Sequence, residues 1–210
     1  MIFFGEASII TLILWKCVMC MRDLLRIKFG ITDSSLIEEI IQVGKVEVFP
    51  KGSMIVESGK ESVYMPILLE GVARGYLIDA NGKDITDCFA YQKGDILSGC
   101  NEIGTVSQVN IEAITAVTCV MVPVKYIFEL FDRYPKFLGV YNRLLTAALD
   151  RHWEIKMLLY RCEAMERYLW FQENYADIVD IVSNRHIASF LGMTPVTLSR
   201  LRRKIRETNL

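Results

Sequence analysis

Histidine is nearly absent from this sequence of 210 residues, which contains only His152 and His186. The stretch Val46–Val124 has none. A metal enzyme built on a β-barrel needs several histidine ligands, so this absence argues against that class. The six cysteines are scattered, whereas a disulfide framework is expected in short, cysteine-dense secreted chains. We therefore expect reduced thiols, no metal site, no cofactor and no enzyme activity.

Long hydrophobic runs are also missing. The run Ile9–Trp15 is bracketed by Glu6 and Lys16 and is much shorter than the roughly 20 apolar residues of a membrane-spanning helix. A secretory signal would need a basic leader and a small-residue cleavage site, and neither is present. Residues 1–20 are an uncertain extension: an added amphipathic helix, a membrane tether, or a start-site artefact with translation beginning at Met21. We favour the start at Met21 and expect a cytoplasmic protein with no membrane partner.

Acidic residues are missing from one further stretch, Ile181–Arg206, although the whole chain carries a formal net charge of −1. The cations of this stretch are Arg185, Arg200, Arg202, Arg203, Lys204 and Arg206. A basic patch on a nearly neutral protein is typical of phosphate binding. The alternative is a basic helix that is merely solvated, and the residues around the cations decide between the two.

The same stretch has the pattern of a helix-turn-helix. Ala188 is small where two helices approach each other, and Gly192 lies four residues later, where a tight turn needs a positive φ. Thr194 can cap the second helix, and Pro195 suits its first position. At these spacings the four residues predict two helices joined by a turn, a unit that enters the major groove of DNA.

Short β-prone segments fill the middle of the chain, after an expected helix at about Ile31–Val43. They alternate with turn signals such as Asn81-Gly82, which predicts a type I′ hairpin. The expected strands are Val46–Phe49, Met54–Glu57, Val63–Leu69, Ala73–Ile78, Ile85–Tyr91, Ile111–Ile114 and Thr118–Val122. Short strands at this spacing predict a closed or sandwiched antiparallel β domain.

Helical periodicity returns after Pro123, first at Lys125–Tyr134 and then in a long helix at Lys136–Arg161. The heptad a and d positions of the long helix are Leu138, Tyr141, Leu145, Ala148, His152, Ile155 and Leu159. This seam predicts a contact between two protomers, although three heptads are also compatible with a helix packed on its own β domain. His152 is interpreted as a polar seam residue that fixes register, with an effector contact or a pH-sensitive pair as the alternative.

The order of β domain, long helix and helix-turn-helix resembles the Crp/Fnr family of bacterial transcription regulators. The resemblance covers residues 21–210 and rests on Glu163–Tyr168, Ile187–Gly192 and Thr197–Leu201, with β turns such as Gly94-Asp95. It implies an α+β fold with an N-terminal antiparallel β-roll of the cyclic-nucleotide-binding jelly-roll type, a long dimerisation helix and a C-terminal winged helix-turn-helix. The implied domains are 21–134, 135–161 and 162–210, after the uncertain extension at 1–20.

The chain departs from the cyclic-nucleotide members of that family where the ligand would bind. Gly94–Leu97 matches the start of their motif, but Gly99 replaces the Glu that holds the ribose, and Ser107-Gln108 replaces the Arg–Ser/Thr pair that holds the phosphate. No Arg or Lys lies between Gly94 and Lys125, so a buried phosphate would lack a counter-charge. We expect no binding of cyclic AMP or cyclic GMP.

The effector that the resemblance implies is therefore an uncharged or weakly polar small molecule. Its expected pocket is lined by Gly99, Cys100, Asn101, Ser107, Gln108, Val109, Asn110 and His152. If side chains fill this pocket, the protein is constitutive or responds to another signal, such as thiol oxidation. A redox- or metal-responsive sensor of the same fold is the alternative, although the pair Cys17 and Cys20 is a weak signal for an iron–sulfur cluster.

The residues expected to contact DNA are Arg185, Thr194, Val196, Thr197, Ser199, Arg200, Arg203, Lys204 and Arg206. Arg200 can bond bidentately to a guanine, with Thr197, Ser199 or Arg203 at neighbouring bases. Val196 stands where many family members have a Glu that reads cytosine, so the operator should differ from the usual one. The expected phosphate contacts are Arg185, Thr194, Arg203, Lys204 and Arg206.

The expected function is that of a homodimeric regulator that binds a palindromic operator in double-stranded DNA. RNA polymerase is left open as a further partner.

Overall fold

The structure is a computed structural model and describes residues 19–99 and 102–208. Contacts within the chain divide it into two compact units. The first takes the chain up to Ala73 together with Ala90–Pro135, and the second takes Arg74–Phe89 together with the chain from Lys136 onward. The segment 74–89 is therefore grouped with the C-terminal helices, although the sequence places it in the middle of the β region. The expectations for residues 1–18 lie outside the described residues.

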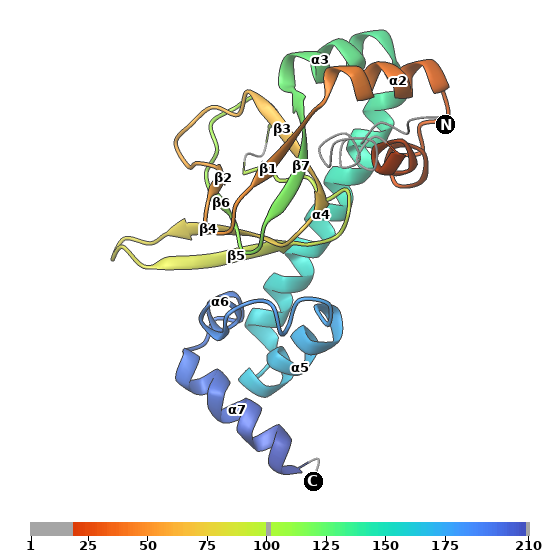
Figure 1. Cartoon of the computed structure of the whole chain (residues 1–210). Coiled ribbons are helices and arrows are strands. Elements are labelled where there is room, and N and C mark those ends of the chain that lie inside the picture. Colours follow the sequence, from red (N-terminus) through yellow and green to blue (C-terminus); the bar gives the residue numbers. More distant parts are fainter. Residues whose placement is uncertain (1–18, 100–101, 209–210) are drawn as a thin grey trace, which may run out of the picture. The chain divides into compact units, whose positions relative to one another are not determined.

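The first unit is built around an antiparallel sheet in the order β1-β7-β3 (Figure 1). The bounds of its strands are Lys45–Phe49 for β1, Tyr64–Glu70 for β3 and Val117–Pro123 for β7. Because β7 is central, Val120 lies opposite both Val46 of β1 and Ile67 of β3. A second antiparallel pair joins β2, Met54–Val56, to β6, Asn110–Ala113. The strands predicted for these segments are confirmed.

A hydrophobic core lies between these strands. Leu68, Val117 and Cys119 are fully buried in it, and Leu97 and Ile111 are nearly so. Burial of an aliphatic side chain of this size contributes about 1.5–3 kcal/mol relative to exposure. Buried and half-buried residues alternate along β6, whereas β3 and β7 each bury four consecutive residues.

Helices flank the sheet in the first unit: residues 19–27 are helical, α2 is Ser34–Val43 and α3 is Val124–Arg133. The Asp33 carboxylate caps α2, since it accepts hydrogen bonds from two backbone N–H groups of the first turn at 2.9 and 3.2 Å. Arg133 of α3 forms an ion pair with Glu39 of α2. The hydrogen bond from Arg133 lowers the pKa of Glu39 below its ordinary value, against the opposing effect of burial.

The strands β4, Ala73–Ile78, and β5, Asp84–Ala90, pair as a hairpin, but its turn is not of type I′. That turn needs a positive φ at two central residues, and no residue other than glycine has one among the described residues. Gly82 alone is left-handed here, with φ 78°, and its N–H donates to the Asp79 carbonyl at 3.0 Å. The Asp79 carboxylate also accepts from the N–H groups of Asn81 and Lys83, at 2.8 and 2.9 Å. These bonds stabilise a longer loop that ends on glycine.

Helices make up the rest of the second unit. Their bounds are Pro135–Arg161 for α4, Ala164–Asn174 for α5, Asn184–Phe190 for α6 and Pro195–Thr208 for α7. A capping box between Glu163 and Glu166 starts α5. Aromatic rings fill the space around it: Phe171 stacks on Tyr175 with centroids 4.8 Å apart, and Phe190 packs edge-on against both. The predicted long helix and the predicted helical pair at the C-terminal end are confirmed.

The wing expected from the resemblance is not formed by the described residues. α7 runs to Thr208, and residues 162–208 contain no strand. Instead, Pro195 suits the first position of a helix, and Leu198, Leu201 and Ile205 recur at helical spacing, which favours one continuous helix over two strands. Within the described part of the chain, no helix is long and apolar enough to cross a membrane.

Candidate nucleic-acid interface

The turn between α6 and α7 depends on Gly192. Its φ of 61° is a left-handed conformation that residues with a Cβ rarely adopt. The N–H of Gly192 donates to the Ser189 carbonyl at 3.1 Å, and the N–H of Met193 donates to the Ala188 carbonyl at 2.9 Å. These bonds satisfy the last carbonyls of α6 and end the helix sharply. The predicted position of the turn is therefore confirmed.

Side-chain caps fix where both helices start. The Thr194 hydroxyl oxygen accepts a hydrogen bond from the N–H of Thr197 at 3.1 Å, which caps α7 as predicted. The Ser183 hydroxyl oxygen accepts from the N–H of His186 at 3.2 Å and caps α6. A fixed first residue determines which side chains of a helix point outward, so these caps set the faces of both helices.

A buried apolar contact holds the two helices together. Ile187 of α6, Leu191 just after α6 and Leu198 of α7 are all fully buried, and Ala188 is buried with them. Arg167 of α5 adds a hydrogen bond of 2.7 Å to the Leu191 carbonyl, so α5 also contacts the turn. The pair is thus a rigid unit on which exposed side chains can be displayed.

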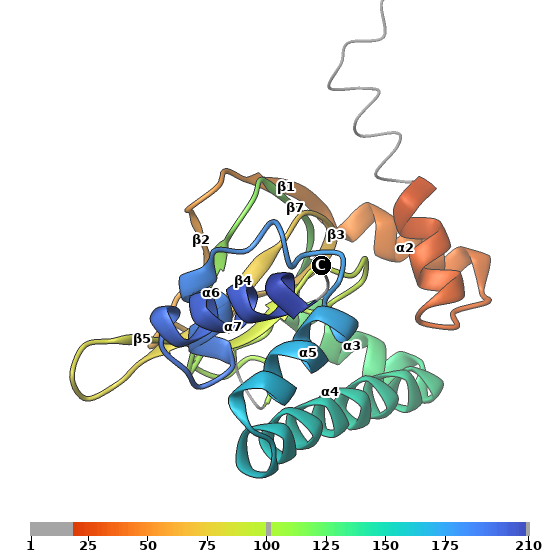
Figure 2. The same ribbon diagram turned by 90° about the horizontal axis from the view of Figure 1, so that it is seen from below.

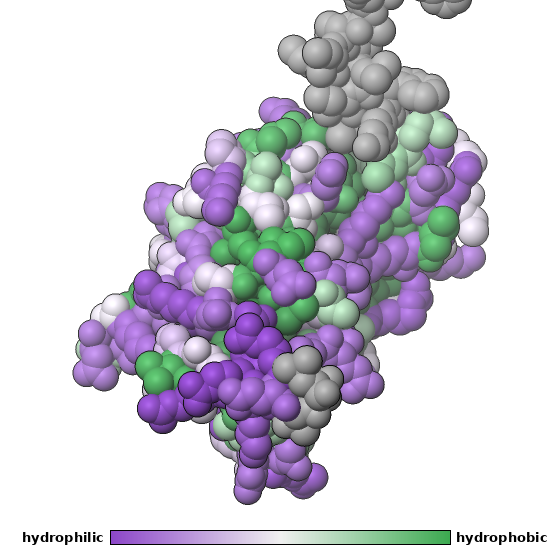
Figure 3. All heavy atoms as spheres, turned by 60° about the horizontal axis from the view of Figure 1, so that its bottom comes forward, coloured by the Kyte–Doolittle hydropathy of each residue, from purple (hydrophilic) through white to green (hydrophobic). Residues whose placement is uncertain are grey.

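One outward face of α7, the recognition face, carries most of the predicted DNA contacts. Its members are exposed, and each lies three or four residues from another member. They are Val196, Ser199, Arg200 and Arg203, with Lys204 and Arg206 at the margins. Figure 3 brings the α7 end of the chain forward and shows hydrophilic side chains gathered over it. Thr197 is half-buried instead, and its hydroxyl oxygen lies 2.9 Å from that of Thr194.

Arg202 is the cation of this stretch that points inward. Its Nε donates to the Tyr168 hydroxyl at 2.7 Å, and its terminal nitrogens donate to Asn184 at 2.6 Å and to the Val179 carbonyl at 3.3 Å. The guanidinium thereby joins α7 to α5 and to the start of α6. Its role is structural, in agreement with its absence from the expected DNA contacts.

Arg185 of α6, a predicted phosphate contact, is bonded to an acid on β5, Asp84. Its terminal nitrogen lies 2.9 Å from one oxygen of Asp84, and Arg74 lies 3.1 Å from the other. Burial alone would raise the pKa of Asp84, but the hydrogen bonds from Arg74 and then Arg185 outweigh it and hold that pKa below its ordinary value. Nothing in the sequence signals this pair, because its partners are 101 positions apart.

The long helix α4 exposes an apolar stripe, although not all of the predicted seam. Leu138 and Leu145 are exposed and His152 lies on the same side, whereas Ile155 is buried within the chain. The exposed positions Leu149 and Trp153 continue the stripe at spacings of four residues. Near its C-terminal end the helix packs on α5, where Glu154 accepts a hydrogen bond from the Trp170 indole at 3.2 Å, so the inner face is occupied there.

The predicted effector residues of the first unit are packed against one another. Ser107 is buried and donates its hydroxyl to the Val109 carbonyl at 2.7 Å, while the N–H of Gln108 donates to the Gly99 carbonyl at 2.7 Å. A Cβ at Gly99 would lie only 2.0 Å from the Ser107 hydroxyl oxygen. Asn110 instead accepts from the N–H of Ser58 at 3.0 Å. Cys100 and Asn101 lie outside the described residues, and His152 belongs to the second unit.

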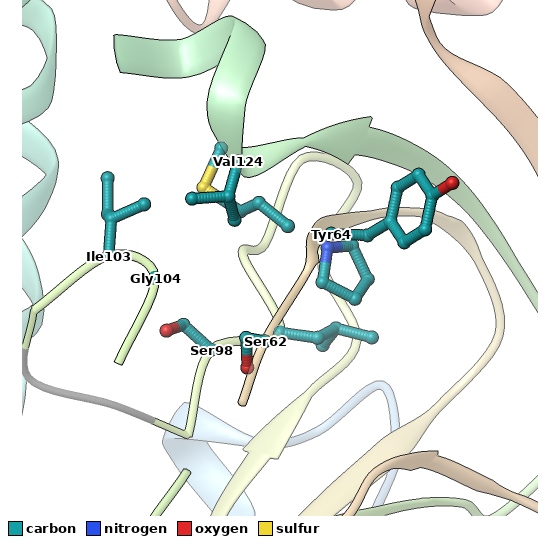
Figure 4. Close-up of a pocket in the computed structure, with 9 residues that line it drawn as sticks. Ser62, Tyr64, Ser98, Ile103, Gly104 and Val124 are labelled. Carbon is teal, nitrogen blue, oxygen red and sulfur yellow. The ribbon is translucent and has the colours of Figure 1, made fainter. Parts of the chain in front are cut away.

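A small hollow in the first unit shares none of these predicted residues. Its lining is Ser62, Tyr64, Met65, Pro66, Leu97, Ser98, Ile103, Gly104 and Val124. It is shallow and partly open to solvent, with enclosed room for only about one water molecule. In Figure 4 the Ser62 and Ser98 side chains lie on one side of it and Val124 on the other, while the Tyr64 ring points away. Two hydroxyls among apolar groups suit a neutral ligand better than a charged one.

Four of the six cysteines lie in the part of the chain that the structure describes. No disulfide joins the four that the structure describes. No group of three or more His, Cys, Asp or Glu side chains gathers in the described part of the chain. Cys119 is fully buried, and burial together with Glu47 raises the pKa of its thiol to about 12.

Comparison with solved structures shows which known proteins have a similar fold. FixK2 from Bradyrhizobium japonicum aligns with a TM-score of 0.68 at 22% identity, covering 80% of this chain and 86% of that one. CLP of Xanthomonas campestris, described as a c-di-GMP responsive global regulator, aligns with a TM-score of 0.69 at 13% identity over 85% of this chain and 94% of that one.

A putative transcriptional regulator of the crp/fnr family from Eubacterium rectale aligns with a TM-score of 0.67 at 15% identity, covering 84% of each chain. No protein-family model matches the sequence, and no curated protein is similar to it in sequence. The similarity lies in the order of the elements rather than in sequence identity: antiparallel strands come first, then a long helix and then a helical pair. This chain has the fold of the Crp/Fnr transcription regulators.

Proposed function

We propose that this protein is a transcription regulator of the Crp/Fnr family that binds an operator in double-stranded DNA and is not an enzyme. The recognition face carries the proposal, because it sets Arg200 and Arg203 outward on a helix with a fixed start. In a helix-turn-helix, the first residues of the second helix reach base edges in the major groove. Val196 and Arg200 stand at those positions. Lys204 and Arg206 stand farther along, where phosphates are within reach.

The regulator is proposed to act as a homodimer through α4. Leu138, Leu145, Leu149 and Trp153 are each between 44% and 57% exposed, and they lie along one side of a helix. A row of large apolar side chains in water is unfavourable and is typical of a contact surface. A second copy of α4 would cover it and set two recognition faces about one helical turn of DNA apart, so the operator would be palindromic.

The effector is proposed to be a small, uncharged or weakly polar molecule rather than a cyclic nucleotide. Ser107 fills the place next to Gly99 and uses its own hydroxyl in a hydrogen bond, which supports this view. The protein would work in the cytoplasm, where DNA lies, with RNA polymerase as a further partner.

Selection of binding sites from random duplexes tests the DNA-binding proposal. Full-length protein should enrich an inverted repeat whose half-sites lie about 10–10.5 base pairs apart, centre to centre. A control variant with Arg200, Arg203 and Lys204 all changed to Ala keeps the buried side of α7 and should enrich nothing. Enrichment of no sequence by the wild type, or of the same sequence by the control, would overturn the proposal.

A further inference from the structure

The hairpin of β4 and β5 packs against α6, the first helix of the helix-turn-helix (Figure 2). The backbone N–H of Thr86 donates to the Ser189 hydroxyl oxygen at 3.0 Å. The ring of Phe89 lies with its centroid 5.3 Å from that of Phe190 and also packs against Phe171 and Tyr175. Since the first helix of such a motif crosses the DNA backbone, the hairpin lies on an element that DNA has to approach.

A carboxylate on the hairpin links it to α6. Asp84 at the start of β5 accepts from Arg185 with one oxygen, at 2.9 Å, and from Arg74 with the other, at 3.1 Å. Arg185 is one of the cations that we expect on DNA phosphates. Carboxylates and phosphates are alternative partners of a guanidinium, because both accept charge-assisted hydrogen bonds.

The two arginines differ in how firmly they are held. The Arg74 side chain is only 3% exposed, donates to the Thr86 hydroxyl at 3.0 Å and lies over the Tyr76 ring at 4.4 Å. These contacts lie within the hairpin and fix Asp84 there. The Arg185 side chain is 69% exposed. The bond between Asp84 and Arg185 is therefore the one that can exchange partners at low cost.

We propose that the β4–β5 hairpin is an electrostatic latch, in which the Asp84 carboxylate takes the place of a DNA phosphate at Arg185, so that the hairpin and DNA compete for α6. This inference rests on the DNA-binding function proposed above. The hairpin continues covalently into the first unit at Ala73 and at Ala90. A signal that moves the hairpin would therefore change DNA affinity without altering the recognition face.

The first test compares Asp84→Asn with the wild type in binding to a labelled duplex of about 30 base pairs, long enough for two half-sites. The variant keeps the shape of the side chain but loses its charge, so Arg185 is released. Affinity should rise about two- to fivefold for each protomer, the range of a partly exposed ion pair. A dimer that releases two latches should gain about four- to twenty-five-fold.

Matched variants separate the latch from other effects. Asp87→Asn removes the same charge from the same strand, outside the described ion pairs of Asp84, and should change affinity less than about twofold. Ser189→Ala removes the bond from Thr86 without a change of charge and should also raise affinity. In an Arg185→Ala background, Asp84→Asn should have no further effect, because its partner is gone.

The outcomes distinguish the latch from the function on which it rests. An Asp84→Asn protein that binds DNA no better than Asp87→Asn, or that gains equally with and without Arg185, overturns the latch and leaves DNA binding intact. If no variant binds DNA, the proposed function fails, and hydrogen exchange still tests the contact. The Thr86 amide should be protected in the wild type and exchange faster in both Asp84→Asn and Ser189→Ala, with its rate unchanged in Asp87→Asn. Equal exchange rates of the Thr86 amide in all four proteins contradict the latch, whether or not the proteins bind DNA.

Discussion

The Nε of Arg202 donates a hydrogen bond to the hydroxyl of Tyr168 at 2.7 Å, and this bond ties the second helix of the helix-turn-helix to α5. The next residue, Arg203, is 73% exposed and has an ion pair with Glu207 one helical turn on. Two adjacent arginines thus have different functions, one holding the domain together and one facing solvent. Charge type alone does not distinguish them, whereas their positions around the helix do.

Arg202→Ala should therefore destabilise the second unit, while Arg203→Ala should not. The first change leaves the Tyr168 hydroxyl and Asn184 without a charged donor, which costs about 1–3 kcal/mol. The second removes an exposed side chain and should change the free energy of unfolding by less than about 0.5 kcal/mol. Urea unfolding followed by tryptophan fluorescence measures both, since Trp153 and Trp170 lie in this unit. Equal stabilities for the two variants would contradict the structural role of Arg202.

Arg200 and Lys204 should differ in how they affect DNA binding. Arg200→Ala should lose about 1–3 kcal/mol of discrimination at one base pair of the selected operator, because the proposed bidentate contact to a base would be lost. Lys204→Ala should weaken binding to all sequences alike and reduce the slope of affinity against salt by about one ion. Titration of both variants against operator and mismatched duplexes at several salt concentrations makes the comparison. If Arg200→Ala weakens every duplex equally, Arg200 is a phosphate contact instead.

Leu145→Glu should separate the proposed dimer into monomers. It would place two like charges in the apolar stripe of α4, where the proposed contact brings identical helices together. Ala147→Glu is the control, since residue 147 is also exposed and lies about 200° around the helix from residue 145. Sedimentation should show a monomer for the first variant and a dimer for the second, and the monomer should lose operator affinity because half-sites no longer act together. A dimeric Leu145→Glu protein would move the interface away from this stripe.

The helix-turn-helix was predictable because its signals are local. Gly192 alone permits the left-handed turn, and Thr194 and Pro195 specify the start of the next helix, so three neighbouring residues determine the geometry. The same holds for the strands, whose turn residues and alternation lie within a few positions of one another. Such local patterns can be recognised without knowing how the rest of the chain folds.

The parts that could not be predicted depend on contacts between distant residues. α4 is apolar on two sides, and the heptad pattern did not reveal that Ile155 faces its own chain while Trp153 is exposed. The bond between Asp84 and Arg185 joins a β strand to a helix, and neither residue carries a local signal. Ser107 next to Gly99 looked like a lost ligand contact, and only the packing shows that its hydroxyl fills the space.

Cys119 should be the least reactive of the described cysteines, which bears on the alternative of a redox sensor. Its thiol is fully buried, and burial with the nearby Glu47 raises its pKa to about 12, so almost no thiolate exists at neutral pH. Cys88 and Cys162 are half-buried. Timed alkylation of the folded protein at about pH 8, read by mass spectrometry, should modify Cys119 last. Rapid modification of Cys119 would show that the β domain opens readily and would strengthen the redox alternative.

The first unit should not bind cyclic AMP or cyclic GMP. The place beside Gly99 is filled by the Ser107 hydroxyl, which already donates to a backbone carbonyl. Two cations from outside the segment, Arg74 and Arg151, are engaged in the second unit, where Arg74 pairs with Asp84 and Arg151 lies over the Tyr175 ring at 5.7 Å.

An ionised phosphate at that place would lose its hydration and gain neutral hydrogen bonds worth only about 0.5–1.5 kcal/mol each, which cannot offset the burial of its charge. Calorimetry at millimolar nucleotide should therefore show no saturable heat. The melting temperature should also stay constant, because a ligand that binds only the folded state must raise it. A clear rise with either nucleotide, absent with 5′-AMP as the control, would mean that Arg74 or Arg151 leaves its present partner to meet the phosphate. In that case Arg74→Ala or Arg151→Ala should abolish the rise, and the sensor would respond to a cyclic nucleotide after all.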